Sequence, residues 1–128
     1  MAIRIVQLGS QRMKDEGLRI GTVRRPPRGV PKSEFAVRDF YDVWLPMLAP
    51  SEALVKKARS SKDEKEWRSF VKSYRKEMSS PENSRVLDLL VGLSHHANFS
   101  VGCHCSDEQT CHRSVLRALL IERGALLV

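Results

Sequence analysis

The chain has 128 residues, of which 41% are hydrophobic and 29% are charged, a composition typical of one globular domain. Its formal net charge of +7 favours anionic partners, such as nucleic acid, nucleotides or phosphorylated metabolites. No apolar run approaches the roughly 20 residues of a membrane span, and the N-terminus lacks the apolar core of a secretory signal, so we expect a single cytoplasmic domain over residues 1–128 with no membrane contact.

The first part of the chain predicts two strands followed by a turn. Short runs rich in β-branched residues predict strands over residues 3–8 and 18–23, with a polar loop between them. The Pro-Pro-Arg-Gly sequence at residues 26–29 then disfavours both a helix and a central strand. We therefore expect the chain to leave the sheet after the second strand.

This turn is a candidate anion site. From Arg19 to Ser33 the chain carries five basic residues and no acidic one. A guanidinium group suits phosphate because its fork of N–H donors matches the phosphate oxygens. We therefore expect a phosphate group to bind Arg24, Arg25 and Arg28, with a solvated, proline-stiffened loop as the alternative.

Helices are predicted through the middle of the chain, after an irregular or partly extended stretch over residues 35–50 that contains a short helix. Ser51, Asp63 and Ser80 are good helix N-caps, so we expect helices to begin after them. Basic and acidic residues alternate over residues 56–76, which is typical of a solvated helix face. One helix also carries an apolar stripe that we expect to pack in the core, formed by Trp67, Phe70, Val71, Tyr74 and Met78.

The segment CHCSDEQTCHR, residues 103–113, holds all three cysteines of the chain. A third strand is predicted before it, over residues 98–103, and an amphipathic helix after it. The long segments between the three strands would serve as crossovers, so we expect neighbouring strands in one sheet that is at least partly parallel. Ligands bind at the carboxyl ends of such strands, beside the free N–H groups of the helix that follows.

The cysteines allow three interpretations. In the first, Cys105 and Cys111 form a thiol pair across the loop, suited to peroxide sensing or persulfide transfer. Cys111, His112 and Arg113 would lie in the first helical turn, which predicts Cys111 as the most acidic thiol. Phosphatase-type chemistry is disfavoured, because the residue six after Cys105 is a cysteine and not an arginine.

The second interpretation is a zinc site, and the third is that Cys103 is an apolar core residue. Cys-x-Cys spacing is tight for a tetrahedral ion and no second ligand pair is evident elsewhere, so we expect no structural zinc and no cofactor. If zinc does bind, its ligands are Cys103, Cys105, Cys111 and either His112 or His104.

The C-terminal sequence CHCSDEQTCHRSVLRALLIERGA resembles the signature of the domain of unknown function 488 family, in which a strand, a cysteine and an acidic loop precede Cys-His-Arg and an amphipathic helix. Cys105 and the triplet Cys111, His112 and Arg113 match this signature. The segments VRRPPRGVPK and YDVWLPMLAPS resemble the N-terminal half of the YeaO-like branch of the family. The resemblance implies a single small Rossmann-like α/β domain with a mostly parallel sheet flanked by helices. It implies no particular activity.

The basic turn and the cysteine segment together suggest one site. We expect the basic turn and the cysteine segment to meet at one sheet edge, where Cys105, Cys111 and Arg113 would be catalytic and Arg24, Arg25, Arg28 and His112 would bind the ligand. The leading hypothesis is an enzyme or redox-responsive protein that acts on a phosphate-bearing small molecule. The alternatives are a non-catalytic module that binds nucleic acid or nucleotides, and a zinc-stabilised interaction domain.

Overall fold

The computed structural model describes residues 2–60, 62–105, 107–108 and 111–128. Within the cysteine segment at residues 103–113, positions 106, 109 and 110 lie outside the described residues. The strands are β1 (Ile3–Gln7), β2 (Leu18–Gly21), β3 (Val43–Trp44) and β4 (Phe99–Cys103). The α-helices are α1 (Glu52–Arg59), α2 (Glu64–Met78), α3 (Pro81–Ser94) and α4 (His112–Glu122), and short 3₁₀ helices span Lys32–Glu34 and Pro46–Leu48.

In the described part of the chain, the strands form one four-stranded sheet of order β1-β4-β2-β3. Every adjacent pair is parallel, with Ile3 opposite Phe99 and Ile20 opposite Val101. The three strands predicted from the sequence are neighbours, as expected. The two residues of β3 carry too little pattern to be predicted, and they extend the sheet at its β2 edge.

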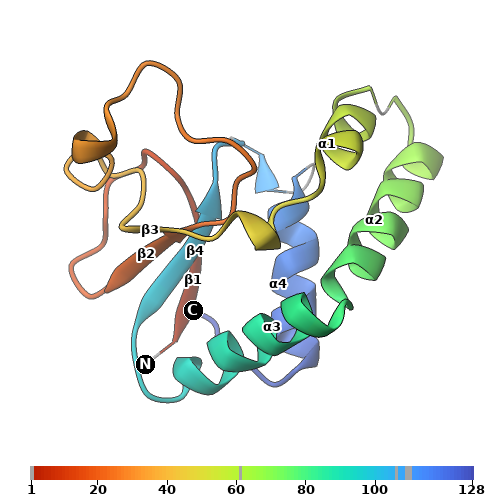
Figure 1. The fold of residues 1–128 in the computed structure, drawn as a ribbon. Helices are drawn as coiled ribbons and strands as arrows, with labels where there is room; N and C mark the ends of the chain where they lie inside the picture. Colours follow the sequence, from red (N-terminus) through yellow and green to blue (C-terminus); the bar gives the residue numbers. More distant parts are fainter. Residues whose placement is uncertain (1, 61, 106, 109–110) are drawn as a thin grey trace.

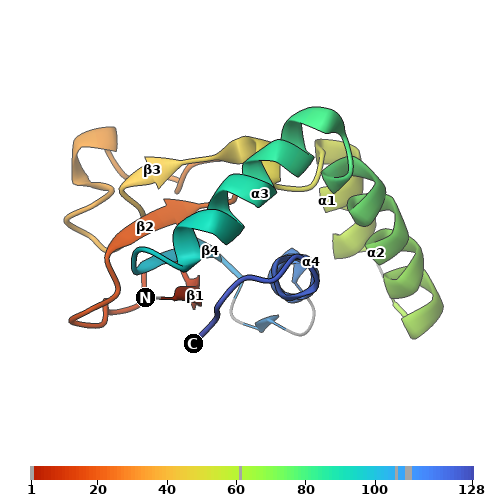
Figure 2. The same ribbon diagram turned by 90° about the horizontal axis from the view of Figure 1, so that it is seen from below.

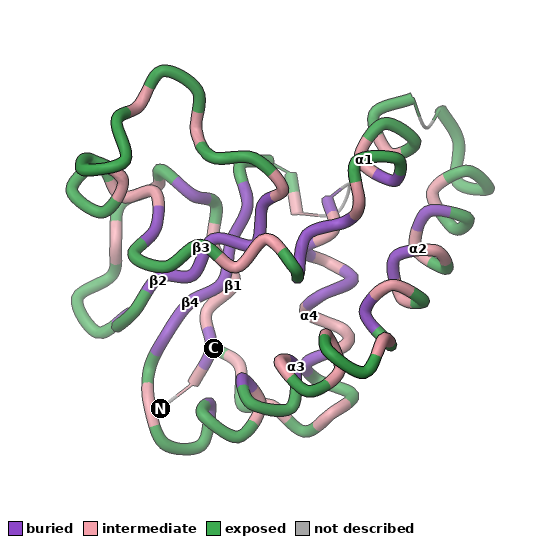
Figure 3. The backbone as a smooth tube through the Cα atoms, in the orientation of Figure 1, coloured by how far each residue is buried: buried purple, intermediate pink, exposed green. Residues whose placement is uncertain are grey.

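The helices gather on one face of the sheet, while the loops over residues 9–17 and 24–42 lie on the other (Figures 1 and 2). On the helical face the inward residues of three strands, among them Ile20, Phe99 and Val101, meet the apolar sides of the helices in one core. All five residues of β4 are buried, as expected for a central strand covered on both faces (Figure 3). The chain is therefore an α/β domain with a parallel sheet.

The helices begin where the sequence predicted. The side chains of Ser51, Asp63 and Ser80 accept hydrogen bonds from backbone N–H groups in the first turns of α1, α2 and α3. On α2, three residues of the apolar stripe are buried in the core, whereas Trp67 is half-buried and stacks on the Phe70 ring with 5.0 Å between centroids. The stripe is therefore core, but Trp67 lies at its margin.

The second face of the sheet is packed by side chains from loops, and two strand glycines allow close contacts, one with a loop side chain and one with the neighbouring strand. A Cβ on Gly21 would lie 2.4 Å from the ring of Tyr41, and a Cβ on Gly102 would lie 2.5 Å from the Val6 carbonyl oxygen. Real Cβ atoms do not approach so closely, so both positions require glycine. Leu8 and Tyr41 join Cys103 and Cys111 in a second, smaller apolar cluster.

A buried ion pair lies on this second face. The guanidinium of Arg19 donates two hydrogen bonds to the carboxylate of Glu16, at 2.7 and 2.9 Å, and both residues are about 1% exposed or less. Its remaining nitrogen donates to the carbonyls of Ser10 and Asp39, and Ser100 on β4 donates to Glu16. The pair thus ties two loops to the sheet, and Arg19, which the sequence placed in the basic turn, is unavailable to a ligand.

No helix in the described ranges is both long and apolar enough to cross a membrane.

The buried pair predicts an acid-sensitive fold. Burial alone would raise the pKa of Glu16, but hydrogen bonds from Arg19, Ser100 and the Met13 backbone lower it from 4.5 to about 2. Its contribution is therefore complete above pH 4.5 and disappears as the pH falls towards 2. We expect urea unfolding to show a loss from this group of about 2 kcal/mol by pH 3.

The control is a double variant, Glu16→Gln with Arg19→Met, which replaces the ion pair by neutral side chains without leaving either charge buried alone. It should lose less stability than the wild type between pH 6 and pH 3. Equal losses in the two proteins would show that other carboxylates account for the acid sensitivity.

Candidate functional site

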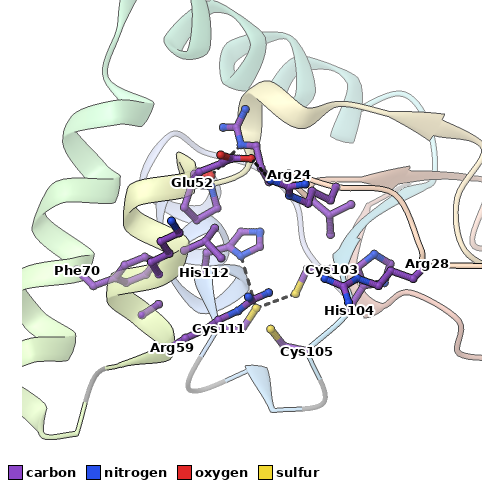
Figure 4. Close-up of a pocket in the computed structure, with 16 residues that line it drawn as sticks. Arg24, Arg28, Glu52, Arg59, Phe70, Cys103, His104, Cys105, Cys111 and His112 are labelled. Carbon is purple, nitrogen blue, oxygen red and sulfur yellow. Dashed lines mark hydrogen bonds and ion pairs between the residues drawn. The ribbon is translucent and has the colours of Figure 1, made fainter.

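A cavity of about 580 Å³ opens at the carboxyl edge of the sheet. Its walls come from the segments that follow β2 and β4 and from the helices α1, α2 and α4 (Figure 4). Because all the strands are parallel, β2 and β4 end at the same edge. The structure therefore brings the basic turn and the cysteine segment, which are about 80 residues apart, to one cavity.

The cavity wall is strongly cationic. Its only acidic residue among those described is Glu52, whose carboxylate already pairs with Arg25. Against it stand five basic residues, which are Arg24, Arg25, Arg28, Lys56 and Arg59. This imbalance favours an anionic occupant.

The five basic side chains are not equivalent. Arg24 donates from Nε and Nη2 to the carbonyl oxygens of Pro50 and Ala49, so it fastens the basic turn to the chain that leads into α1. By contrast, Arg28, Lys56 and Arg59 form no ion pair with any carboxylate in the described ranges. These three cations are free to bind a ligand.

Lys56 and Arg59 are the functional candidates that the sequence did not single out. They belong to a region that alternates basic and acidic residues, and we interpreted it as a solvated face. The available signal was their spacing of three residues, which places them on one side of α1 together with Val55. Only the position of α1 over the sheet edge shows that this side faces the cavity.

The sulfur atoms of Cys103, Cys105 and Cys111 point towards one another at the cavity (Figure 4). Cys103 ends β4 and is 1% exposed, which confirms the expectation that it is buried. Cys111 is the N-cap of α4 and is 2% exposed, with its Sγ 2.7 Å from the Sγ of Cys103. Cys105 is exposed, and its sulfur points towards those of Cys103 and Cys111 (Figure 4).

The prediction that Cys111 is the most acidic thiol is wrong. Hydrogen bonds from Cys103 and Cys111 lower the pKa of Cys105, and the positive charge of Arg113 lowers it further. The pKa of Cys103 is raised by its bonds to the other thiols and by burial. The bond from Cys103 lowers the pKa of Cys111, but the bond to Cys105 and burial outweigh it. A helix start therefore does not lower a thiol pKa when the side chain is enclosed.

His112 is held in one orientation. Its Nε2 lies 2.8 Å from the carbonyl oxygen of Thr22, and its ring meets the edge of Tyr74 with 5.7 Å between centroids. Burial lowers the pKa of His112, so the ring is neutral at neutral pH. A carbonyl oxygen can only accept, which puts the proton on Nε2 and leaves the Nδ1 lone pair 3.6 Å from Cys111 Sγ.

Arg113 lies away from the cavity, in contrast to the role expected for it. It is 4% exposed, and its Nη2 donates a 2.6 Å hydrogen bond to the carbonyl oxygen of Cys105. It is not among the residues that line the cavity. The Arg113 guanidinium is therefore bonded to the backbone of the cysteine segment, and its charge contributes to the lowered pKa of Cys105.

Exposure and thiol pKa together predict the order of alkylation. In reduced, metal-free protein, iodoacetamide at neutral pH should modify Cys105 first, because Cys103 and Cys111 are buried and their pKa values are raised. Peptide mass spectrometry over a time course measures the order. Modification of Cys111 ahead of Cys105 would restore the expectation drawn from its place at the helix start.

Comparison with protein families agrees with this architecture. The family model DUF488-N3a, described as "Active DUF488-N3 subclade", matches residues 3–124. Comparisons with curated proteins and with solved structures gave no match. The matched range covers nearly the whole chain, including both segments that meet at the cavity, and it confirms the resemblance found in the sequence. The chain belongs to the domain of unknown function 488 family.

Proposed function

We propose that the cavity binds a phosphate-bearing small molecule, and that the sulfur and imidazole groups on its wall act on this ligand or report the redox state of the protein. One observation carries the proposal. Five basic side chains line the cavity against a single carboxylate, which is already paired with Arg25. Without an anion, this concentration of positive charge would oppose the folded state through its own repulsion.

The size of the cavity favours a small ligand. Its volume of about 580 Å³ lies within the range of roughly 300–1,000 Å³ that is common for small-molecule sites. A surface for single-stranded nucleic acid instead offers exposed aromatic rings on which bases stack. The only Phe, Tyr or Trp among the described lining residues is Phe70, which is 1% exposed. A nucleotide or another phosphorylated metabolite therefore fits better than a nucleic-acid strand.

The chemistry of the wall favours an enzyme over a passive binding module. The cavity places a thiol of lowered pKa, Cys105, and a neutral imidazole, His112, beside the proposed anion. The description of the matching family as an active subclade is consistent with this assignment. The alternative is a non-catalytic module that binds nucleotides or nucleic acid. The titrations described below compare small phosphate compounds with an oligonucleotide as ligands of the cavity.

The proposal predicts that binding depends on the unpaired cations. Isothermal titration of inorganic phosphate, a set of nucleoside monophosphates and a short single-stranded oligonucleotide compares the candidate ligands. Arg28→Gln and Arg59→Gln should each weaken binding of the best phosphate compound by roughly tenfold or more, because a hydrogen bond to a charged group contributes about 1.5–3 kcal/mol.

The matched control is Arg85→Gln, which removes the same charge from an exposed position of α3 that does not line the cavity. It should leave the affinity within about twofold, since distant surface charges are screened. Equal weakening by Arg85→Gln and Arg59→Gln would indicate general charge attraction and not a site. Binding of the oligonucleotide alone would assign the surface to nucleic acid.

A further inference from the structure

We propose that Cys103, Cys111 and His112 bind a single Zn²⁺ ion, with Cys105 as the fourth ligand. The proposal does not depend on phosphate binding by the arginines, but it assigns to a metal ion the sulfur and imidazole groups that the proposed function places beside the ligand. It reverses the expectation from the sequence, which found no second ligand pair to join Cys-x-Cys. The fold supplies that pair when α4 begins beside the end of β4.

The ligand atoms are already gathered. Sγ of Cys103, Sγ of Cys111 and a ring nitrogen of His112 all lie within 4.8 Å of one another, and the sulfur of Cys105 faces the same point (Figure 4). Two or three thiolates with one imidazole form a donor set typical of zinc. No other group of three such ligand atoms occurs among the residues that the structure describes.

The orientation of His112 is that of a metal ligand. A histidine that binds a metal through one nitrogen almost always donates its other N–H to a carbonyl or carboxylate oxygen. Here that acceptor is the carbonyl of Thr22, a residue that is itself fixed because its N–H and Oγ1 both donate to Gly102 on β4. The lone pair of Nδ1 is therefore held beside the sulfurs before any metal arrives.

Arg113 provides a second, independent observation. Its guanidinium is 4% exposed, it forms no ion pair with any described carboxylate, and its Nε is buried without a hydrogen-bond partner. The charge of Arg113 helps to lower the pKa of Glu108, but that carboxylate is already paired with Arg117. A buried cation whose charge is only partly compensated is destabilising. A Zn²⁺ ion with three thiolates and a neutral histidine carries a net charge of −1, and this anion would lie near Arg113, whose positive charge already lowers the pKa of Cys105.

Metal binding requires a small local adjustment. Zinc–sulfur bonds of about 2.3 Å in a tetrahedron keep two sulfurs about 3.8 Å apart, so Cys103 and Cys111 would separate by roughly 1 Å from their 2.7 Å contact. Cys111 precedes α4 without a side-chain hydrogen bond to the helix, so a rotation of its side chain breaks no cap. The competing fate of this pair is a disulfide, and the experiment must separate the two.

The test begins with reduced, metal-free protein purified without a metal-affinity tag. Titration with CoCl₂ should give the visible d–d bands and the sulfur-to-cobalt charge-transfer band of a tetrahedral thiolate site, saturating at one equivalent. ZnCl₂ should displace the cobalt. The zinc-loaded protein should resist the thiol reagent DTNB until a chelator is added.

The variants separate ligands from neighbours. His112→Gln should abolish the cobalt thiolate spectrum or weaken binding at least a hundredfold, whereas His104→Gln, which changes the adjacent cavity histidine, should leave it unchanged. Cys105→Ser should still bind one equivalent, but at least tenfold more weakly, because it removes one of four ligands. This variant alters an exposed residue, so folding is not at risk.

Two outcomes would overturn the proposal. The first is a native, reduced protein that shows no thiolate bands with cobalt and in which DTNB titrates Cys105 at the same rate with and without zinc. The second is the loss of two thiols to a chelator-resistant disulfide between Cys103 and Cys111 with no metal bound. Neither outcome bears on phosphate binding, which the Arg28 and Arg59 variants test separately.

Discussion

The parallel pairing of β4 with strands on both of its sides determines where every candidate functional group lies. Because β1, β2 and β4 run in one direction, the residues that follow them leave the sheet at a common edge. Cys103 lies at the end of β4, and Thr22 follows the end of β2. The first residue of α4, His112, contacts the carbonyl oxygen of Thr22. An antiparallel β4 would have placed the cysteines at the opposite end from the basic turn.

Arginine has two different uses in this small domain. Arg19 is fully buried, and its guanidinium is saturated by a carboxylate and two carbonyls, so it joins the loops of the second face to the sheet. Arg28 and Arg59 have no such partners and remain at the cavity wall. The difference does not lie in the residue type. It lies in whether the surrounding backbone offers enough acceptors to replace water.

The sequence was sufficient for the helices, for three of the four described strands and for their common edge, because these depend on local signals; the two residues of β3 carry no such signal. Ser51, Asp63 and Ser80 marked the helix starts by side-chain chemistry alone. The sequence was insufficient where burial determines the partners or the pKa of a side chain. Arg19 resembles its neighbours in the basic turn until Glu16, from an otherwise polar loop, is seen beside it. The acidity of Cys111 was overestimated for the same reason, since position on a helix is local and enclosure is not.

The place of β4 in the sheet also governs when the fold can form during synthesis. β4 lies in the last quarter of the chain, yet β1 pairs with it, and Ile3 bonds to the backbone near the C-terminus. Until β4 has left the ribosome, the part of the chain that the structure describes offers β1 no partner strand, and β2 has only the short β3. Such distant pairing slows folding and leaves strand edges exposed to other chains. The domain must therefore fold after nearly all of it has been translated, and an interrupted chain that ends before residue 99 would retain two unprotected apolar strands.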